Sequence, residues 1–389
     1  MKNKFIIIVF IIILYSVFFF VPIKELLIRR GTISYYRSDN WELVNKSNDK
    51  VYDKIMTFEA FIKNRYNNYF PFYNKINNLY YSSIINVDKL YLKDIYLKDN
   101  ADNERIFYND ENDFYYVLNK YSKKDLEDRL KNQVLFYNDI NNKYPDINLA
   151  LYIPLRYESF KFNNINSNYD LIDEFTHKLN HNIKYTLFNV DNIDEYNRYY
   201  YRADHHYNSY GAQVAYNDIL KMYNINSNLQ VSHKDVFEPY YGSMAKSTLL
   251  KKVSDKLTAI DISNDLKVNI DDINFKPLEK RDRKDPFYDH YIGYFNGMYD
   301  EIIYENNSSF NRNLLIIGDS YSWQVDYLLA KSFDKTFVIN TKYGKWVDNN
   351  LVLKDYIKDN NITHILFFRE AKNLIFDADN LNVDKKVIR

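Results

Sequence analysis

The sequence predicts an α/β protein with a mostly parallel sheet and helices on both faces, a three-layer fold. Short apolar runs of the kind found in strands buried on both faces recur along the chain. Stretches with apolar residues at helical intervals fall between several of them, as from Leu126 to Tyr137 and from Leu351 to Ile357. Such alternation of strand and helix is typical of a parallel sheet. The expected strands are 114–118, 147–154, 184–190, 314–317, 336–339 and 364–368.

The expected folded domain covers residues 51–389, which is enough chain for a large apolar core. It opens with a helical pattern within 51–85, in which a helix ends near Pro71 because proline disrupts helical hydrogen bonding. The segment 225–312 breaks the alternation of strand and helix. We therefore expect this segment to be an insertion with the character of a cap or lid.

The N-terminus predicts a membrane anchor. Residues 5–23 are uncharged and almost wholly apolar, and as a helix they would span about 28 Å, enough to cross a bilayer. No small-residue cleavage signature follows before Lys24, which favours an uncleaved signal anchor over a removed signal peptide. We expect residues 1–4 in the cytoplasm, 24–50 as a stalk, and the body of a single-pass cell-membrane protein in an extracytoplasmic location. A buried core helix is the alternative for the apolar run.

The composition excludes several classes of function. Lys plus Arg and Asp plus Glu both number 52, so net charge gives no reason to expect a nucleic-acid partner. The absence of cysteine excludes disulfides, thiolate catalysis and cysteine metal sites. Glycine is scarce, with seven in all, and Gly211 and Gly318 flank two motifs that carry candidate catalytic residues. These two glycines are interpreted as tight turns around one site, whereas Gly242 is as well explained as an ordinary loop residue.

The two motifs are Ala-Asp-His-His-Tyr at 203–207 and Leu-Leu-Ile-Ile-Gly-Asp-Ser at 314–320. They supply a serine, a histidine and a carboxylate, the set in which a base activates a weak hydroxyl nucleophile and a third group orients the base. Ser320 follows a buried strand and precedes a helical pattern over 321–333, and ligands of open α/β sheets bind at such carboxyl ends. Backbone N–H groups at the start of that helix are expected to form part of an oxyanion hole. We predict Ser320 as nucleophile, His206 as base and Asp204 as the orienting carboxylate.

Residues next to the three predicted catalytic ones are expected to have supporting roles. His205 is expected to pack or to form structural hydrogen bonds, and Asp319 is expected to brace its turn through its own backbone. Arg369 follows the last expected strand, and a surface role is the favoured interpretation for it. The alternatives are contact with an anionic sugar or bracing of a carboxylate.

The stretches Tyr-Arg-Ala-Asp-His-His-Tyr-Asn-Ser-Tyr-Gly-Ala at 201–212 and Gly-Asp-Ser-Tyr at 318–321 resemble the signature blocks of the DHHW family. This family is similar to the SGNH-hydrolase-like proteins of alginate and other polysaccharide O-acetylation. The resemblance implies an SGNH-hydrolase-like, flavodoxin-like fold and the same Ser-His-Asp assignment. Tyr207 stands where the signature has tryptophan, which keeps an aromatic wall. The oxyanion and substrate-binding residues expected on this basis are Tyr321, Asn296, Gly293 and Tyr207, with Arg369 beside them.

A serine triad performs acyl transfer, and an anchored protein that faces outward has surface glycans within reach. The resemblance implies a polysaccharide O-acetyltransferase, or else an acetylesterase, without a cofactor or metal. It also implies a multi-spanning membrane partner that delivers the acyl group. One alternative is a non-catalytic protein that binds glycan or organises an export complex. Another is a metal-dependent phosphoesterase, because an Asp-His-His run also serves as a metal-binding motif.

Overall fold

The computed structural model of the chain describes a large part of its C-terminal three quarters. The chain divides into two compact units, residues 1–83 and 84–389, and almost all of the described residues belong to the second unit. The described residues are 79, 82, 83, 85, 94–100, 104–119, 123–162, 169–226, 229–248, 250–262, 265–270, 273–274, 290–295, 299–341, 346 and 351–376.

The predicted cytoplasmic end, anchor and stalk, 1–4, 5–23 and 24–50, lie outside the described residues, as does nearly all of the helical pattern in 51–85. Within the described part of the chain, no helix combines the length and the apolar character needed to cross a membrane. The anchor and the domain boundaries therefore stay predictions.

The unit 84–389 is built around an eight-stranded sheet with the order β5-β4-β13-β11-β12-β10-β8-β9. The first five strands in this order pair in parallel, and the last three add antiparallel pairs at one side. This mixed, largely parallel sheet confirms the expected α/β class. The strands are β4 (Asn148–Pro154), β5 (Lys184–Phe188), β8 (Lys267–Ile270), β9 (Ile273–Asn274), β10 (Glu301–Glu305), β11 (Asn313–Gly318), β12 (Lys335–Asn340) and β13 (His364–Phe368).

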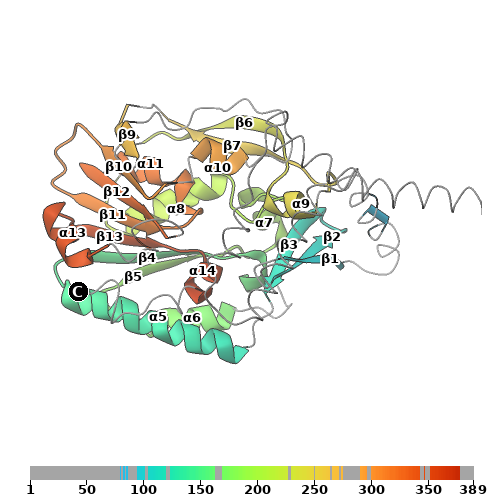
Figure 1. Ribbon diagram of the computed structural model, residues 1–389, viewed down its shortest axis with the longest axis horizontal. Helices are drawn as coiled ribbons and strands as arrows, with labels where there is room; N and C mark the ends of the chain where they lie inside the picture. The colour runs from blue at the N-terminus through green and yellow to red at the C-terminus, as the bar shows by residue number, and fades with distance from the viewer. Residues whose placement is uncertain are drawn as a thin grey trace, which may run out of the picture. The chain divides into compact units, whose positions relative to one another are not determined.

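Helices cover both faces of this sheet, with α5 and α6 below it and α8 above it in the view of Figure 1. The long helix expected around Leu126 to Tyr137 is α5, and the shorter one expected near Leu351 is α13. The helices are α5 (Lys123–Lys143), η1 (Tyr157–Ser159), α6 (Tyr169–His177), α7 (Ile193–Tyr199), α8 (Ser209–Met222), α9 (Ser243–Thr248), α10 (His290–Phe295), η2 (Ser322–Gln324), α11 (Asp326–Ala330), α13 (Leu353–Asp359) and α14 (Ala371–Phe376).

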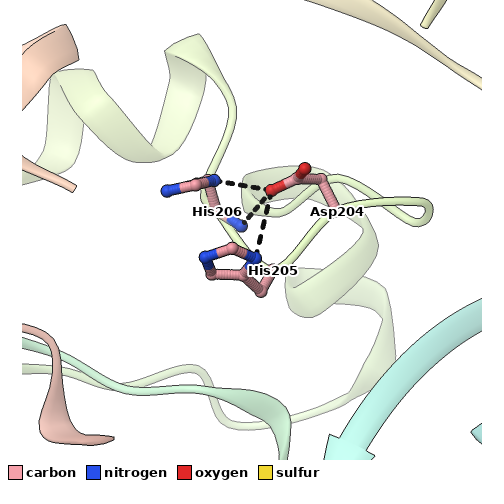
Figure 2. Close-up of side chains that lie close together, drawn as sticks. All are labelled: Asp204, His205 and His206. Carbon is pink, nitrogen blue, oxygen red and sulfur yellow. Dashed lines mark hydrogen bonds and ion pairs between the residues drawn. The ribbon is translucent and has the colours of Figure 1, made fainter. Parts of the chain in front are cut away.

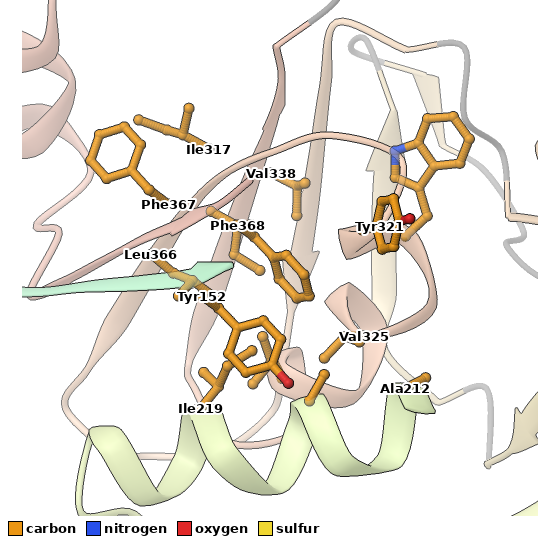
Figure 3. Close-up of a cluster of buried hydrophobic side chains, with 14 of the residues drawn as sticks. Tyr152, Ala212, Ile219, Ile317, Tyr321, Val325, Val338, Leu366, Phe367 and Phe368 are labelled. Atoms are coloured by element: carbon orange, nitrogen blue, oxygen red, sulfur yellow. The ribbon is translucent and has the colours of Figure 1, made fainter. Parts of the chain in front are cut away.

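The core forms on both sides of the central strands because their side chains alternate between the two faces while both faces are covered. Figure 3 shows Tyr152 and Phe368 on the side of the strands that faces α8, in one cluster with Ile219 and Val325. Phe367, next in sequence to Phe368, turns to the other face and packs edge-on against Phe136 of α5, with ring centroids 5.7 Å apart. The near-continuous apolar runs read in the sequence are therefore strands buried on both faces.

Two smaller antiparallel sheets accompany the main one. The predicted strand at 114–118 belongs to a three-stranded sheet of β1 (Asp94–Asn100), β2 (Glu104–Asn109) and β3 (Phe114–Asn119) rather than to the parallel sheet. β6 (Ser232–Tyr240) pairs with β7 (Asp255–Asp261). Both of these last strands fall in the expected insertion.

Part of the segment 225–312, which we expect to be an insertion with the character of a cap or lid, belongs to the main sheet. Its strands β8, β9 and β10 extend the main sheet, and β10 pairs directly with β12. The physical reason is the pattern of β10, where Ile302 and Tyr304 alternate with less buried residues and complete one apolar face of the sheet. Helices α9 and α10 and the hairpin of β6 and β7 also come from this segment.

Candidate active site

Ser320 lies in the turn that leaves β11 at the carboxyl edge of the parallel strands. The turn is held by Asp319, whose Oδ1 accepts a hydrogen bond from the backbone N–H of Tyr321 at 3.0 Å. Its Oδ2 accepts from the backbone N–H of Glu370 at 2.8 Å and from Asn373 Nδ2 at 2.7 Å. Asp319 thus braces its own turn, as expected, and also ties it to the residues that follow β13.

The segment after Ser320 is less regular than the single helix expected over 321–333. It consists of the short 3₁₀ helix η2 followed by the five-residue helix α11. The backbone N–H groups of Tyr321 and Ser322 are already bound to Asp319, through its side chain and its carbonyl oxygen respectively. The expected oxyanion hole at a helix N-terminus is therefore not formed by these two groups, because the turn itself uses them.

His206 and Asp204 lie in the loop between α7 and α8. Tyr200 and Tyr207 form an isolated antiparallel bridge that closes this loop. Directly after it, the Asn208 side chain caps α8 by accepting hydrogen bonds from Tyr210 N at 2.9 Å and Gly211 N at 3.3 Å. The cap and the bridge fix both ends of the segment that carries the Asp-His-His run.

The fold brings the two motifs together although Ser320 and His206 are 114 positions apart. His206 Nε2 lies 2.8 Å from Ser320 Oγ, and His206 Nδ1 lies 2.6 Å from Asp204 Oδ1. Figure 2 shows the Asp204 carboxylate aimed at the His206 ring. All three side chains are buried, with relative exposures of 5% for Ser320, 6% for His206 and 2% for Asp204. The geometry matches that of a hydroxyl nucleophile, a base and an orienting carboxylate.

Asp204 is held by groups from three parts of the chain. Its Oδ1 also accepts the backbone N–H of His206 at 3.0 Å, while Oδ2 accepts from the Tyr240 hydroxyl at 2.9 Å and from Ser243 N at 2.5 Å. Burial by itself would raise the pKa of this carboxyl, but the neighbouring His206 and His205 and the hydrogen bonds hold the pKa well below its usual range. Asp204 is therefore an ionised hydrogen-bond acceptor at neutral pH.

Gly242 makes this arrangement sterically possible. A Cβ atom built on Gly242 would lie 2.3 Å from Asp204 Cβ and 2.4 Å from its Oδ2, closer than nonbonded atoms approach. The backbone at 242–243 comes this near so that Ser243 N can donate to the carboxylate. The interpretation of Gly242 as an ordinary loop residue is thus wrong.

His205 points to a different partner. Its Nδ1 lies 2.7 Å from Ser243 Oγ, and it is 3.5 Å from Asp204 Oδ1. His206 is therefore the histidine that reaches Ser320, and His205 has the structural hydrogen bond expected of it.

Asp204, His205 and His206 also place three potential metal ligand atoms within 4.8 Å of one another, the one such cluster among the described residues. The protein already uses these atoms: His206 bonds at both ring nitrogens, and both Asp204 oxygens accept hydrogen bonds. Because a metal ligand needs a free lone pair directed at the ion, this donor set fits a serine triad better than a metal centre.

Two residues expected near the oxyanion or substrate are buried and hold the site together. Tyr207 is 0% exposed, and its hydroxyl donates to the carbonyl oxygen of Tyr321. Tyr321 is also fully buried, with its hydroxyl bound to the carbonyl oxygen of His205. Both hydroxyls link the histidine loop to the serine turn, because they satisfy carbonyl groups that would otherwise be buried without a donor.

Arg369 is 1% exposed and lies directly after β13, where its backbone N–H donates to Tyr152 O. A surface role does not fit this burial. Gly293 lies in α10, and no described contact links it to Ser320. Asn296 lies outside the described residues.

A buried ionic cluster that the sequence analysis missed lies at the same edge of the sheet. Arg156, which follows β4, pairs with Glu104 of β2 at 2.5 Å and also with Glu370. Lys372 pairs with the same Glu104 at 2.7 Å. Burial would raise the pKa of Glu104, but Arg156 and Lys372 overcome it and lower this pKa to about 2. The cluster ties the three-stranded sheet to the turns beside Ser320, and no local pattern signals it because its members come from distant segments.

Solved structures of known proteins share this architecture. A crystal structure of a DHHW family protein from Eubacterium siraeum superposes with a TM-score of 0.59 and 19% identity, covering 75% of this chain and 98% of that one. The fold is that of a DHHW family protein. Two structures of Bacillus cereus PatB1, one of them with a sulfonyl adduct, are also similar to this chain, with TM-scores of 0.56 and 0.55 and identities of 20% and 19%. They cover 73% and 72% of this chain and 98% of their own.

These neighbours agree with the family resemblance read from the two motifs. No protein-family model matches the chain, and no curated protein sequence matches it.

Proposed function

We propose that this chain is a membrane-anchored serine acyl-transfer enzyme that acts outside the cytoplasm on a cell-surface or exported polysaccharide. The observation that carries the proposal is the continuous chain of contacts from Asp204 through His206 to Ser320, at 2.6 and 2.8 Å. An O-acetyltransferase is the preferred form and an acetylesterase the second. The acyl group would come from a multi-spanning membrane partner.

The first half of the reaction forms an acyl-enzyme. Ser320 Oγ attacks the carbonyl carbon of an acyl donor while its proton passes to His206 Nε2, and Asp204 stabilises the imidazolium that results. The tetrahedral intermediate then collapses, the bond to the leaving group breaks, and the imidazolium returns the proton to that group. Asp204 suits this role because its low pKa keeps it ionised throughout.

The second half transfers the acyl group. A hydroxyl of the acceptor sugar attacks the acyl-serine, His206 takes its proton, and the proton returns to Ser320 Oγ as the ester bond to the enzyme breaks. Water in place of the sugar gives hydrolysis by the same steps. The burial of the triad supports transfer, since an enclosed site limits access of bulk water to the acyl-enzyme.

The comparisons support a reactive nucleophile. PatB1, which shares the fold, has been solved with a sulfonyl adduct, and sulfonyl reagents form such adducts by reaction with activated nucleophiles. The geometry also favours this proposal over a metal-dependent phosphoesterase, because the Asp204 and His206 atoms that would bind a metal are engaged within the triad.

A sulfonyl fluoride probe tests the proposal. We expect the full-length protein to be labelled at Ser320, and Ser320→Ala to lose both labelling and acetyl transfer from a chromogenic acetate ester while its thermal unfolding is unchanged. Ser322→Ala is the matched control, because Ser322 Oγ bonds to Asp326 rather than to His206.

Equal activity in wild type and Ser320→Ala would reject catalysis at this serine. The alternative, a non-catalytic protein that binds glycan or organises an export complex, would then be favoured. Loss of activity on chelation in wild type would argue for the phosphoesterase.

A further inference from the structure

Tyr291 contacts two residues of the proposed triad, His206 and Ser320, although it comes from α10 within the segment 225–312. Its ring lies nearly parallel to the His206 imidazole, with centroids 4.1 Å apart and an interplanar angle of 13°. Its hydroxyl donates to the main-chain carbonyl oxygen of Ser320 at 3.0 Å. Tyr291 is 2% exposed. One side chain therefore touches the base through its ring and the nucleophile's backbone through its hydroxyl.

The stacked ring has two physical effects on His206. It covers one face of the imidazole, so that the ring cannot turn out of the plane that joins Asp204 to Ser320. It also presents the negative face of its π system to the imidazolium that forms when Ser320 loses its proton, an interaction of the cation–π type. Both effects favour proton transfer along the line from Ser320 Oγ to His206 Nε2.

The hydroxyl acts on the nucleophile. A buried carbonyl needs a donor, and Tyr291 supplies one to Ser320, which fixes the main chain from which Oγ projects. Burial raises the pKa of the Tyr291 hydroxyl well above its usual value, so it remains protonated and able to donate across the physiological range. Tyr291 is itself held by contacts with Phe295 and Trp323, at centroid distances of 4.9 and 5.8 Å.

We propose that Tyr291 is a positioning residue for acyl transfer, which aligns His206 with Ser320 and stabilises the protonated form of His206. The proposal rests on the proposed function of this site. It assigns a catalytic contribution to α10, an element outside both sequence motifs.

Several groups from three parts of the chain face His206. Asp204 and His205 come from its own loop, with His205 at a ring-centroid distance of 4.0 Å. Ser320 and Tyr321 come from the turn after β11, with the Tyr321 ring 4.9 Å away. Tyr291 is the group that approaches from α10. A variant that changes only Tyr291 leaves all the others in place.

Two variants separate the two contacts. Tyr291→Phe keeps the ring and removes the hydroxyl, whereas Tyr291→Leu removes the ring as well. With a chromogenic acetate ester we expect kcat to fall about 5-fold in the Phe variant, the value of one buried hydrogen bond, and about 30-fold or more in the Leu variant, with KM within about 3-fold of wild type in both.

The pH profile distinguishes positioning of the base from a general structural role. Without the Tyr291 ring the imidazolium is less stable. In Tyr291→Leu we therefore expect the acid side of the plot of kcat against pH to move to lower pH by about half a unit to one unit. In Tyr291→Phe the acid side should stay in place. The matched control is Tyr294→Leu, which removes a buried tyrosine of the same helix that packs on Phe295 instead of His206.

An unshifted acid side of this plot in Tyr291→Leu, with a loss of kcat no greater than in Tyr294→Leu, would overturn the proposal. If Tyr291→Leu fails to fold, Tyr291→Phe still tests the proposal. An unchanged kcat in this variant would show that the hydroxyl bond to Ser320 does not position the nucleophile, which contradicts the proposal. A failure of the proposed triad is detected separately. In that case the sulfonyl probe would label wild type and Ser320→Ala equally.

Discussion

At the scale of single residues, Asp204 has the most constrained side chain of the site. Its two oxygens accept hydrogen bonds from His206, Tyr240 and the backbone of Ser243. Its partner within the loop is His206, and the two-residue spacing between Asp204 and His206 is visible in the sequence. Tyr240 and Ser243 come from the far end of β6 and the start of α9, and nothing in their local sequence marks them.

Gly242→Ala tests how closely the Asp204 carboxylate must be held. A Cβ at 2.3 Å from Asp204 Cβ has to displace the carboxylate or the backbone of Ser243. We expect kcat for acetyl transfer to fall by roughly 100-fold, less than the loss of about 10⁴-fold that follows when the orienting carboxylate of a triad is replaced. Steady-state kinetics with an acetate ester measures this.

Ser243→Ala is the comparison, since it keeps the backbone donor to Asp204 and removes only the hydroxyl that contacts His205. It should have a smaller effect than Gly242→Ala. A Gly242→Ala enzyme with wild-type kcat would mean that the carboxylate tolerates displacement.

At the scale of elements, the strand–turn–helix from β11 to α11 was predicted in outline. Leu314 to Ile317 form a buried parallel strand, and the turn that follows carries Ser320 at the expected edge of the sheet. The prediction of an uninterrupted helix after this turn was wrong. Apolar residues at helical spacing indicate which side of a segment is buried, but they do not determine its pattern of backbone hydrogen bonds. Side-chain bonds within the turn, such as Ser322 Oγ to Asp326 Oδ2 at 3.2 Å, accompany the break.

The raised pKa of Asp326 in α11 leads us to expect that the stability of the fold depends on pH. Burial first, and then the charge of Asp319, raise its pKa to about 7 from an ordinary value of 3.8, against the opposing hydrogen bond from Ser322. The folded chain therefore binds this proton more tightly than the unfolded chain, so its contribution to stability is full below about pH 4 and is lost as pH rises to about 7.

Asp326→Asn removes this titration. We expect the variant to gain about 4 kcal/mol in free energy of unfolding over wild type at pH 8, since one pKa unit corresponds to about 1.4 kcal/mol, and to lose that advantage near pH 4. Urea denaturation at both pH values measures the difference. Asp235→Asn, an exposed aspartate of β6, serves as control and should differ from wild type by no more than about 0.5 kcal/mol at either pH. A gain at pH 8 that persists at pH 4 would contradict the linkage.

At the scale of the whole molecule, the residues 5–23 lead us to expect a protein fixed in the membrane with its catalytic unit outside. The full-length protein should remain in the membrane fraction after a high-salt wash, and a chain that lacks residues 1–23 should be released. Protease added to intact cells should digest the body of the protein. Protection of the body in intact cells, with digestion only after lysis, would reverse the orientation.

The sequence by itself determined the class of the fold, the strands that form the centre of the sheet, and the serine, histidine and carboxylate. These follow from short-range patterns: apolar runs, helical spacing, and motifs whose members are neighbours in the chain. Only the tertiary structure decided that Ser320 meets His206 at 2.8 Å, that Tyr207 and Arg369 are buried, and that β10 joins the main sheet. The same holds for Gly242 and Tyr291, which reach the site from the segment expected to be a cap. The physical reason is that such contacts join segments tens to more than a hundred positions apart, and packing, which sets them, leaves no periodic trace in the local sequence.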